Sequence, residues 1–222
     1  AVSQNFIVAR ATAADTGDYT VVARNALGFA SSVTAHVGVD ETMRFINLAT
    51  RGNAGRADSP LIVGFVASGP GNKRVMVRAV GPTLAGFGVA GTLPDPVLRV
   101  FNSSGTQIFA NDDWGQTNDV PGIASANARL GAFPLDGGSA DAAGILTLAP
   151  GAYTVVINGK VVNGTEATGI ALAEIYEDDS ASSRLVNLSS RGFVSPGASV
   201  MIPAFVSAGT GTAVTKKFLI RG

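Results

Sequence analysis

The sequence predicts an all-β protein whose main part is an antiparallel β-sandwich of jelly-roll type with one short helix. The chain has 222 residues, 28 of them glycine, and only 14% are charged. That composition suits short strands joined by many turns. Apolar and polar residues alternate with a period of two in most of the ordered-looking segments. One segment lacks this alternation and favours a helix.

Composition also limits the classes of function. Hydrophobic residues make up 46% of the chain, which is enough for a sizeable core. Sixteen basic residues balance sixteen acidic ones, so no net charge draws the chain to nucleic acid. No apolar run approaches the roughly 20 residues that span a bilayer, so we expect no membrane insertion. The absence of cysteine excludes disulfides and thiol catalysis.

The most informative feature is an internal repeat of about 140 residues. RFINLATRG at residues 44–52 returns as RLVNLSSRG at 184–192, and we call the blocks that begin there the first and the second copy. The correspondence continues from 61–66 to 200–206, and from 73–78 to 216–221. A repeat of this length indicates whole domains in tandem. We therefore expect three parts: the end of one domain at 1–39, a complete sandwich module at 40–180 and the first strands of a second module at 181–222.

The first part has the pattern of a hairpin. Residues 19–24 and 31–37 alternate in strand fashion around the turn at 25–28. The preceding Asp15-Thr16-Gly17-Asp18-Tyr19 resembles the tyrosine corner of immunoglobulin-like (I-set) domains. The resemblance implies that the Tyr19 hydroxyl bonds back to the preceding turn, and that Val21 packs where the family has a cysteine. About three strands of such a domain fit here, so an apolar face should be uncovered.

The complete module should contain about eight strands. The first three strands end at the breaker Gly81-Pro82, and a hairpin turns at 102–105. After Pro121, alanine-rich residues without β-branching favour a short helix that ends at Gly131. The charged, small-residue segment 177–183 should be the linker to the second copy. The predicted strands are 44–50, 61–67, 74–80, 95–101, 106–110, 143–148, 151–158 and 168–176, and the helix is 122–130.

A polar segment before the helix is the best candidate site. Its clustered oxygen ligands suit Ca²⁺, although their spacing is not that of an EF-hand. The alternative, which we favour, is that these side chains cap turns and the following helix. No other cofactor is expected. The candidate calcium ligands are Asn111, Asp112, Asp113, Asn118 and Asp119.

Two aromatic or titratable residues raise weaker hypotheses. Trp114, the single tryptophan, could stack on a sugar ring, but we favour a lid over one end of the core. His36, the single histidine, has no acidic partner close in sequence and should be a solvated strand residue.

Arg78 and Arg221 recur at equivalent places, which favours a structural ion pair over anion binding.

We expect no catalytic activity. No nucleophile elbow, P-loop or dinucleotide-binding motif is present. An enzyme of the glycosidase kind would need a pair of carboxylates to converge in a cleft. The candidates for such a pair are Asp112, Asp113, Asp119, Asp136 and Asp141.

Sequence blocks after residue 44 resemble a repeat of large immunoglobulin-domain-containing exported proteins of bacteria, of the Verrucomicrobia type. They include VRAVGPTLAGFGV at 77–89, NDDWG at 111–115, GAFPL at 131–135, LAPGAYT at 148–154 and GIALAEIYE at 169–177. The resemblance implies an exported, non-catalytic module at the cell surface or outside the cell. Its partners would be neighbouring domains of the same polypeptide, and surface glycans or matrix.

A second, more distant resemblance covers residues 95–176. DPVLRVF at 95–101, NDD at 111–113 and PGAYTV at 150–155 are similar to bacterial pre-peptidase C-terminal domains, β-sandwiches appended to secreted enzymes. We therefore expect a structural or adhesive module of a large exported protein. The alternative is a carbohydrate- or calcium-dependent binding module that is accessory to a secreted enzyme.

Overall fold

The structure is a computed structural model that divides the chain into two compact units. The larger unit comprises residues 45–206, and the smaller unit comprises residues 1–44 together with 207–222. Residues 40–42, where the predicted complete module begins, lie outside the described residues. Described are residues 13–37, 43–55, 58–196, 199–209 and 216–222.

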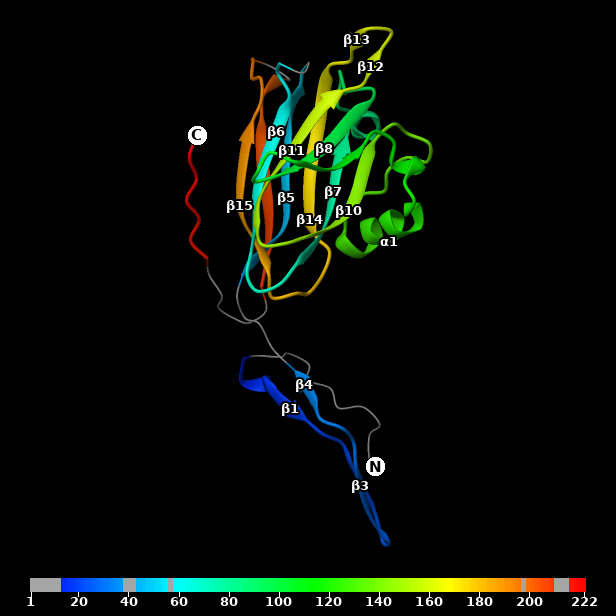
Figure 1. The fold of residues 1–222 in the computed structure, drawn as a ribbon, viewed down its shortest axis with the longest axis vertical. Coiled ribbons are helices and arrows are strands. Elements are labelled where there is room, and N and C mark those ends of the chain that lie inside the picture. Colours follow the sequence, from blue (N-terminus) through cyan, green and yellow to red (C-terminus); the bar gives the residue numbers. More distant parts are fainter. Residues whose placement is uncertain (1–12, 38–42, 56–57, 197–198, 210–215) are drawn as a thin grey trace. The chain divides into compact units, whose positions relative to one another are not determined.

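The larger unit confirms the all-β prediction. Ten strands form one sheet that folds back on itself into two layers; nine of them follow one hydrogen-bonded path, and the tenth pairs with β5 beside it (Figure 1). One layer runs in the order β10 (Ala142–Leu148), β7 (Lys73–Val80), β14 (Gly169–Glu177) and β5 (Arg44–Ala54). The other runs in the order β9 (Gln107–Asn111), β8 (Pro96–Asn102), β11 (Gly151–Gly159) and β6 (Leu61–Ser68).

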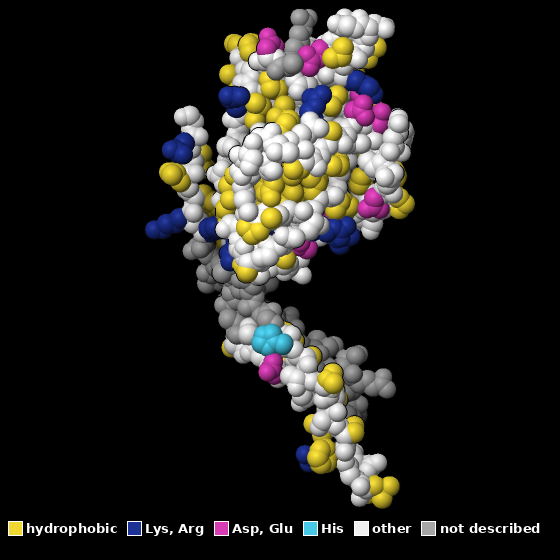
Figure 2. Space-filling model, viewed as in Figure 1, with side chains coloured by type: hydrophobic (Ala, Val, Ile, Leu, Met, Phe, Trp, Pro, Cys, Tyr) yellow, Lys and Arg dark blue, Asp and Glu magenta, His cyan; other side chains and the backbone are white. Residues whose placement is uncertain are grey.

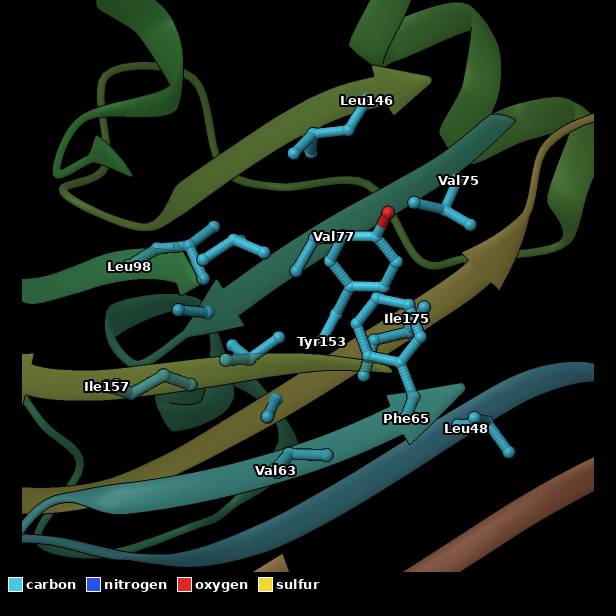
Figure 3. Close-up of a cluster of buried hydrophobic side chains, with 14 of the residues drawn as sticks. Leu48, Val63, Phe65, Val75, Val77, Leu98, Leu146, Tyr153, Ile157 and Ile175 are labelled. Atoms are coloured by element: carbon cyan, nitrogen blue, oxygen red, sulfur yellow. The ribbon is translucent and has the colours of Figure 1, made fainter. Parts of the chain in front are cut away.

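The core lies between these layers. Along β6 the side chains of Leu61, Val63 and Phe65 are buried and alternate with half-buried ones, as the period of two predicts. Phe65 stacks on Tyr153 with ring centroids 5.5 Å apart. The Tyr153 hydroxyl donates to the backbone oxygen of Ala149 at 2.7 Å, which satisfies the polar end of a ring that is otherwise in the core (Figure 3).

The helix forms where the sequence predicts it. Helix α1 (Val120–Leu130) starts one residue before Pro121, and Gly131 ends it with φ of 68°. Two short 3₁₀ helices, η2 (Pro82–Phe87) and η3 (Trp114–Gln116), were not predicted from the sequence. Single turns of this kind carry too little periodicity to be detected.

One small hairpin was also missed. Strands β12 (Val161–Val162) and β13 (Thr165–Glu166) pair across Asn163 and Gly164, both of which have positive φ. An Asn-Gly pair is the preferred sequence for such a two-residue turn. The sequence marked the turn, but the flanking strands are too short to recognise.

The second copy does not form a separate body. Its first strand, β15 (Arg184–Arg191), pairs with β6 along seven residues, and β16 (Ile202–Ala208) pairs with β5. Leu185 on β15 is fully buried. The compact unit therefore runs past residue 180. The division of the chain into two sequence repeats at residue 180 stays a prediction.

The smaller unit contains the predicted hairpin as two short ladders. Strand β1 (Gly17–Tyr19) pairs with β4 (Ala35–Val37), and β2 (Val22–Asn25) pairs with β3 (Gly28–Ser31). A 3₁₀ turn, η1 (Ala13–Asp15), precedes them.

Two sequence expectations in this unit have different outcomes. The Tyr19 hydroxyl donates to the backbone oxygen of Asp15 at 2.7 Å, so the tyrosine corner is confirmed. The prediction that Val21 packs in the place of a cysteine is wrong, because Val21 is 72% exposed.

The third predicted strand of the second copy, at 216–221, is not a strand in the structure.

If β15 belongs to the larger unit, Leu185→Ala should lower the free energy of unfolding by about 2–5 kcal/mol, because it removes fully buried methyl groups. Val186→Ala, next to it and 40% exposed, is the matched control and should cost within about 0.5 kcal/mol. Urea unfolding followed by circular dichroism measures both. Equal, small effects would show that β15 is not part of the folded unit.

Candidate functional site

The polar segment predicted as a calcium site surrounds a lysine. Lys160, just after β11, places its Nζ atom 3.0 Å from Asp112 Oδ2 and 3.5 Å from Asp113 Oδ2. Asp95 Oδ2, at the start of β8, lies 3.6 Å from the same ammonium. We call these four residues the Lys160 cluster. The ammonium occupies the position that a cation would need, which the sequence could not show because Lys160 is 47 residues or more away from its partners (160 − 113).

The charges of the Lys160 cluster affect its members differently. Burial raises the pKa of Asp95, and the neighbouring carboxylates of Asp113 and Asp112 raise it further, against the opposing effect of Lys160. The hydrogen bond to Asp112 and the charge of Asp95 raise the pKa of Lys160. Asp95 Oδ1 is buried and has no hydrogen-bond partner. The ammonium therefore gains more from the cluster than the Asp95 carboxylate does.

The remaining predicted calcium ligands serve the backbone. Asn111 donates from Nδ2 to the Asp113 backbone oxygen at 3.0 Å and accepts from the Ala143 amide at 2.9 Å. Asp119 caps α1 by accepting from the Gly122 amide at 3.1 Å. Asn118 is exposed. Within the described residues, no group of three or more acidic, histidine or cysteine side chains is arranged to hold a metal ion. These contacts fit the capping alternative.

Trp114 lies inside the molecule rather than on a binding surface. It is 8% exposed and packs with Val80, Leu84 and Ile123 in a second core cluster. Its Nε1 donates to the Asp136 backbone oxygen at 3.2 Å. A sugar platform needs an open ring face, so the burial of Trp114 fits the lid over the core and not the sugar contact.

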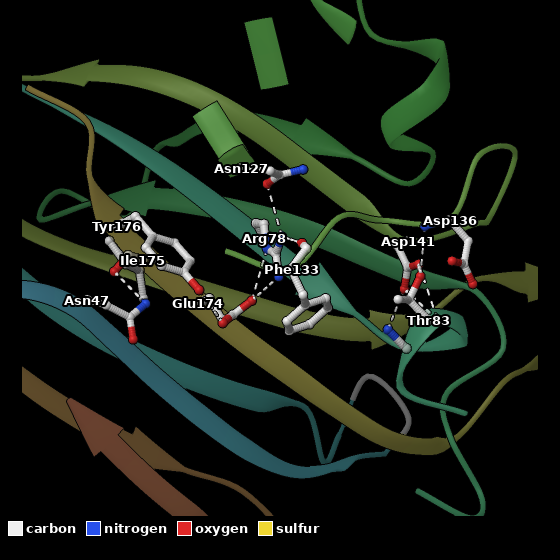
Figure 4. A network of polar contacts seen from close by, with 11 residues as sticks. Asn47, Arg78, Thr83, Asn127, Phe133, Asp136, Asp141, Glu174, Ile175 and Tyr176 are labelled. Carbon is white, nitrogen blue, oxygen red and sulfur yellow. Dashed lines mark hydrogen bonds and ion pairs between the residues drawn. The ribbon is translucent and has the colours of Figure 1, made fainter. Parts of the chain in front are cut away.

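A buried polar network crosses the layer formed by β7 and β14 (Figure 4). Arg78 is fully buried and donates from Nε and Nη2 to Glu174 Oε2 at 2.9 and 2.5 Å. Its Nη1 donates to Asn127 on α1 at 3.0 Å and to the Phe133 backbone oxygen at 2.7 Å. The guanidinium also lies 4.4 Å from the Phe133 ring centroid. The structural role predicted for Arg78 is confirmed.

Tyr176 completes this network. Its hydroxyl donates to Glu174 Oε1 at 2.7 Å. Burial, together with the Glu174 charge and this hydrogen bond, raises the pKa of Tyr176. Both carboxylate oxygens of Glu174 are thus occupied, and the network presents no open group to a substrate.

A second buried carboxylate holds the turn after β7. Asp141 is fully buried and accepts from the Gly81 amide at 2.7 Å, from the Thr83 hydroxyl and from the Ser139 hydroxyl at 2.6 Å. These bonds fix the Gly81-Pro82 corner against β10. Asp141 was one of the carboxylates considered for catalysis, and this position makes it a structural residue.

The predicted linker after β14 acts as a clamp, because its side chains hold it against the start of β7 and the turn before that strand. Lys73 is fully buried and lies 2.7 Å from Asp179 and 3.4 Å from Glu177. Burial alone would raise the pKa of Asp179, but hydrogen bonds from Lys73 and from the amides of Arg74 and Ala181 outweigh it, so the pKa is lowered. Ser183 donates to the Pro70 and Gly71 backbone oxygens at 2.8 Å.

His36 has an acidic neighbour that its place in the sequence did not reveal. Its Nδ1 lies 2.7 Å from Asp18 Oδ1 across the β1–β4 ladder, and both side chains are mostly exposed, at 71% and 67%. An exposed pair of this kind contributes little to stability. It lies on open strands and not in a cleft.

The outer face of the β6, β11 and β8 layer is apolar. Figure 2 shows hydrophobic side chains gathered on one face of the larger unit. The register places Ile62 opposite Val156 and Val66 opposite Ala152, with Thr154 opposite Phe101. Apart from the exposed Ala152, these outward side chains are half-buried. We call this surface the outer apolar face.

Comparisons with known protein families, with curated proteins and with solved structures find no match for this chain. None of the helices in the described part of the chain is long and apolar enough to cross a membrane. The inferences below therefore depend on the geometry of the molecule.

Removing one partner of the buried ion pair should be costly. Arg78→Met should lower the free energy of unfolding by about 3–5 kcal/mol, because it leaves the Glu174 charge buried without its cation. In Arg78→Met/Glu174→Gln the charge is absent and the new amide oxygen can still accept from Tyr176, so this double variant should be more stable than Arg78→Met. Chemical denaturation measures all of these variants. A double variant less stable than Arg78→Met would contradict the assignment.

The Lys160 cluster makes a prediction about metal. Calcium and chelator should give the same thermal midpoint for the natural chain, because the Lys160 ammonium already lies between the carboxylates. Lys160→Met should acquire a midpoint that rises with calcium, since a ligand that binds the folded state stabilises it. Lys217→Met, at an exposed position, is the matched control. A calcium-dependent rise in the natural chain that Asp112→Ala/Asp113→Ala abolishes would instead establish the calcium site.

Proposed function

We propose that this chain is a non-catalytic structural or adhesive part of a large exported modular protein of the bacterial cell surface. One observation carries the proposal: strands of the second copy complete the sandwich of the first. Copies that share strands are physically coupled, as the parts of a tandem array must be. The resemblance to repeats of exported bacterial proteins supports the same setting.

The polar groups support a structural role. The buried carboxylates Glu174 and Asp141 are engaged by neighbouring donors, and the carboxylates of the Lys160 cluster are paired with its ammonium. Catalysis and tight small-ligand binding normally use convergent polar groups in a pocket. In the described residues the larger polar clusters connect strands and turns instead.

The outer apolar face supports adhesion through many weak contacts. Val156 pairs with Ile62 on this face, and Arg99 and Arg191 flank the pair on the neighbouring strands. A single copy of such a surface binds weakly, but many copies on one particle bind strongly because the contacts are linked. The alternative, an accessory binding module, requires that one copy alone has measurable affinity.

The two functions can be separated by varying the number of copies. Beads that carry many copies of the chain should adhere to polysaccharide-coated surfaces, while the free chain shows no binding to the same polysaccharide by calorimetry. Val156→Lys should reduce bead adhesion by placing a charge on the outer apolar face. Thr147→Lys, at an exposed position on β10, is the matched control and should leave adhesion unchanged. Micromolar binding by the free chain would favour the accessory binding module.

A further inference from the structure

The two copies are joined by exchanged strands. In the first copy β5 and β6 follow one another in sequence, yet they lie in different layers and do not pair with each other. Instead β6 pairs with β15, the counterpart of β5, and β5 pairs with β16, the counterpart of β6. Each copy thus supplies the partner that the other lacks.

The register shows that the exchange is symmetric. Phe45 pairs with Leu185, and these positions differ by 140, the repeat spacing. The Thr50 and Ser190 hydroxyls lie 2.6 Å apart and are also 140 residues apart. Self-equivalent contacts of this kind arise where two identical surfaces meet about a two-fold axis.

Packing beyond β15 repeats the pattern. Asn53 forms a bridge with Phe193, again 140 residues apart. A Cβ atom at Gly52 would lie 3.6 Å from Met201 Cγ, and one at Gly192 would lie 3.3 Å from Leu61 Cδ1. Gly52 corresponds to Gly192, and Leu61 corresponds to Met201. The contact from the first copy to the second is therefore matched by the contact from the second to the first.

The second copy's strands also carry an uncovered core face. Phe65 in the first copy is 1% exposed, whereas its counterpart Phe205 is 37% exposed even though it contacts Phe45 with ring centroids 5.0 Å apart. Pro203 on the same face of β16 is also exposed, whereas its counterpart Val63 is fully buried. In the first copy, β11 and the layer of β7 and β14 cover the inner face of β6. The surface that matches this exposed face is the corresponding body of a second copy.

We propose that copies of this repeat bind one another by reciprocal exchange of their first two strands. The edges of β5 and β6 in one copy pair with the first two strands of another copy. These first two strands also pack against the remaining strands of the copy to which they belong. By the same rule, β15 would also pair with a strand equivalent to β14, and β16 with one equivalent to β11. Two copies then share two continuous sheets.

This inference deepens the proposed structural role and takes its biological setting from it. The partner is a copy of the same repeat, because the contacts join equivalent positions of two copies. The strands pair in a register set by the repeat, their glycines lie at matching places, and their buried residues occupy equivalent core positions. An unrelated strand could satisfy the backbone of β6, but it would not place an apolar side chain at the position of the fully buried Leu185.

Engineered disulfides can test the exchange, because the chain has no cysteine of its own. Ser189 on β15 pairs with Gly64 on β6, and a Cβ atom at Gly64 would lie 2.5 Å from Ser189 Oγ. Ala49 is the position equivalent to Ser189 in the first copy (189 − 140). In a copy that pairs β5 with its own β6, Ala49 would take the place that Ser189 holds here. Gly64→Cys/Ser189→Cys therefore reports exchange, and Gly64→Cys/Ala49→Cys reports a self-contained copy.

Under mild oxidation of the full chain, we expect at least about tenfold more disulfide in Gly64→Cys/Ser189→Cys than in Gly64→Cys/Ala49→Cys. A disulfide between chains at 64 and 189 supports the proposal equally, since it places the strand of one chain on β6 of another. A second variant, Thr50→Cys/Ser190→Cys, leaves Gly64 intact and should also cross-link. Arg99→Cys/Ala110→Cys, across β8 and β9, is the control for oxidation and folding.

A disulfide in Gly64→Cys/Ala49→Cys, with none in the two exchange variants, would overturn the proposal. Absence of cross-linking in all three variants while the β8–β9 control forms would overturn it as well. Failure of the proposed function is a different result: cross-linking would report exchange even if the chain bound free ligand or if multivalent beads did not adhere.

Discussion

The fold depends on the need to pair two strand edges. β5 and β6 sit at the ends of opposite layers, where their backbone N–H and C=O groups would face solvent beside an apolar core. Unpaired edges of this kind are sites of uncontrolled association, and proteins normally cover them. Here β15 and β16 provide the cover, and Leu185 is buried as they do so. β15 is therefore joined to the core at Leu185, while β16 adds backbone pairing along β5.

Charged residues are few, and several of them are buried. Only 14% of residues are charged, yet Arg78, Lys73 and Asp141 are fully buried. Each is tied to a partner on another element, such as Arg78 to Asn127 of α1 or Asp141 to Gly81. Burying charge is costly unless it is paired with good geometry, so these contacts favour one arrangement of strands, turns and helix over others.

Local patterns in the sequence were sufficient to predict most of the fold. Alternation of charged and apolar residues located β7, Pro121 and Gly131 bounded the helix, and Asp15 to Tyr19 marked a tyrosine corner that forms. Long-range partners could not be predicted. Nothing near Asp112 reveals Lys160, and the acidic linker could not be recognised as a clamp without its lysine on β7. The repeat was visible in the sequence, but a repeat does not say which copy's strands pair.

The larger unit begins and ends at nearly the same point. Phe45 on its first strand and Phe205 on its last are in ring contact, so the polypeptide enters and leaves side by side. Tension along such a chain would act on the adjacent ends of β5 and β16 and separate their hydrogen bonds one at a time, instead of shearing many bonds together. The body between those two ends therefore lies outside the path along which force is transmitted. It can present a face to its surroundings, but it is poorly suited to bear load.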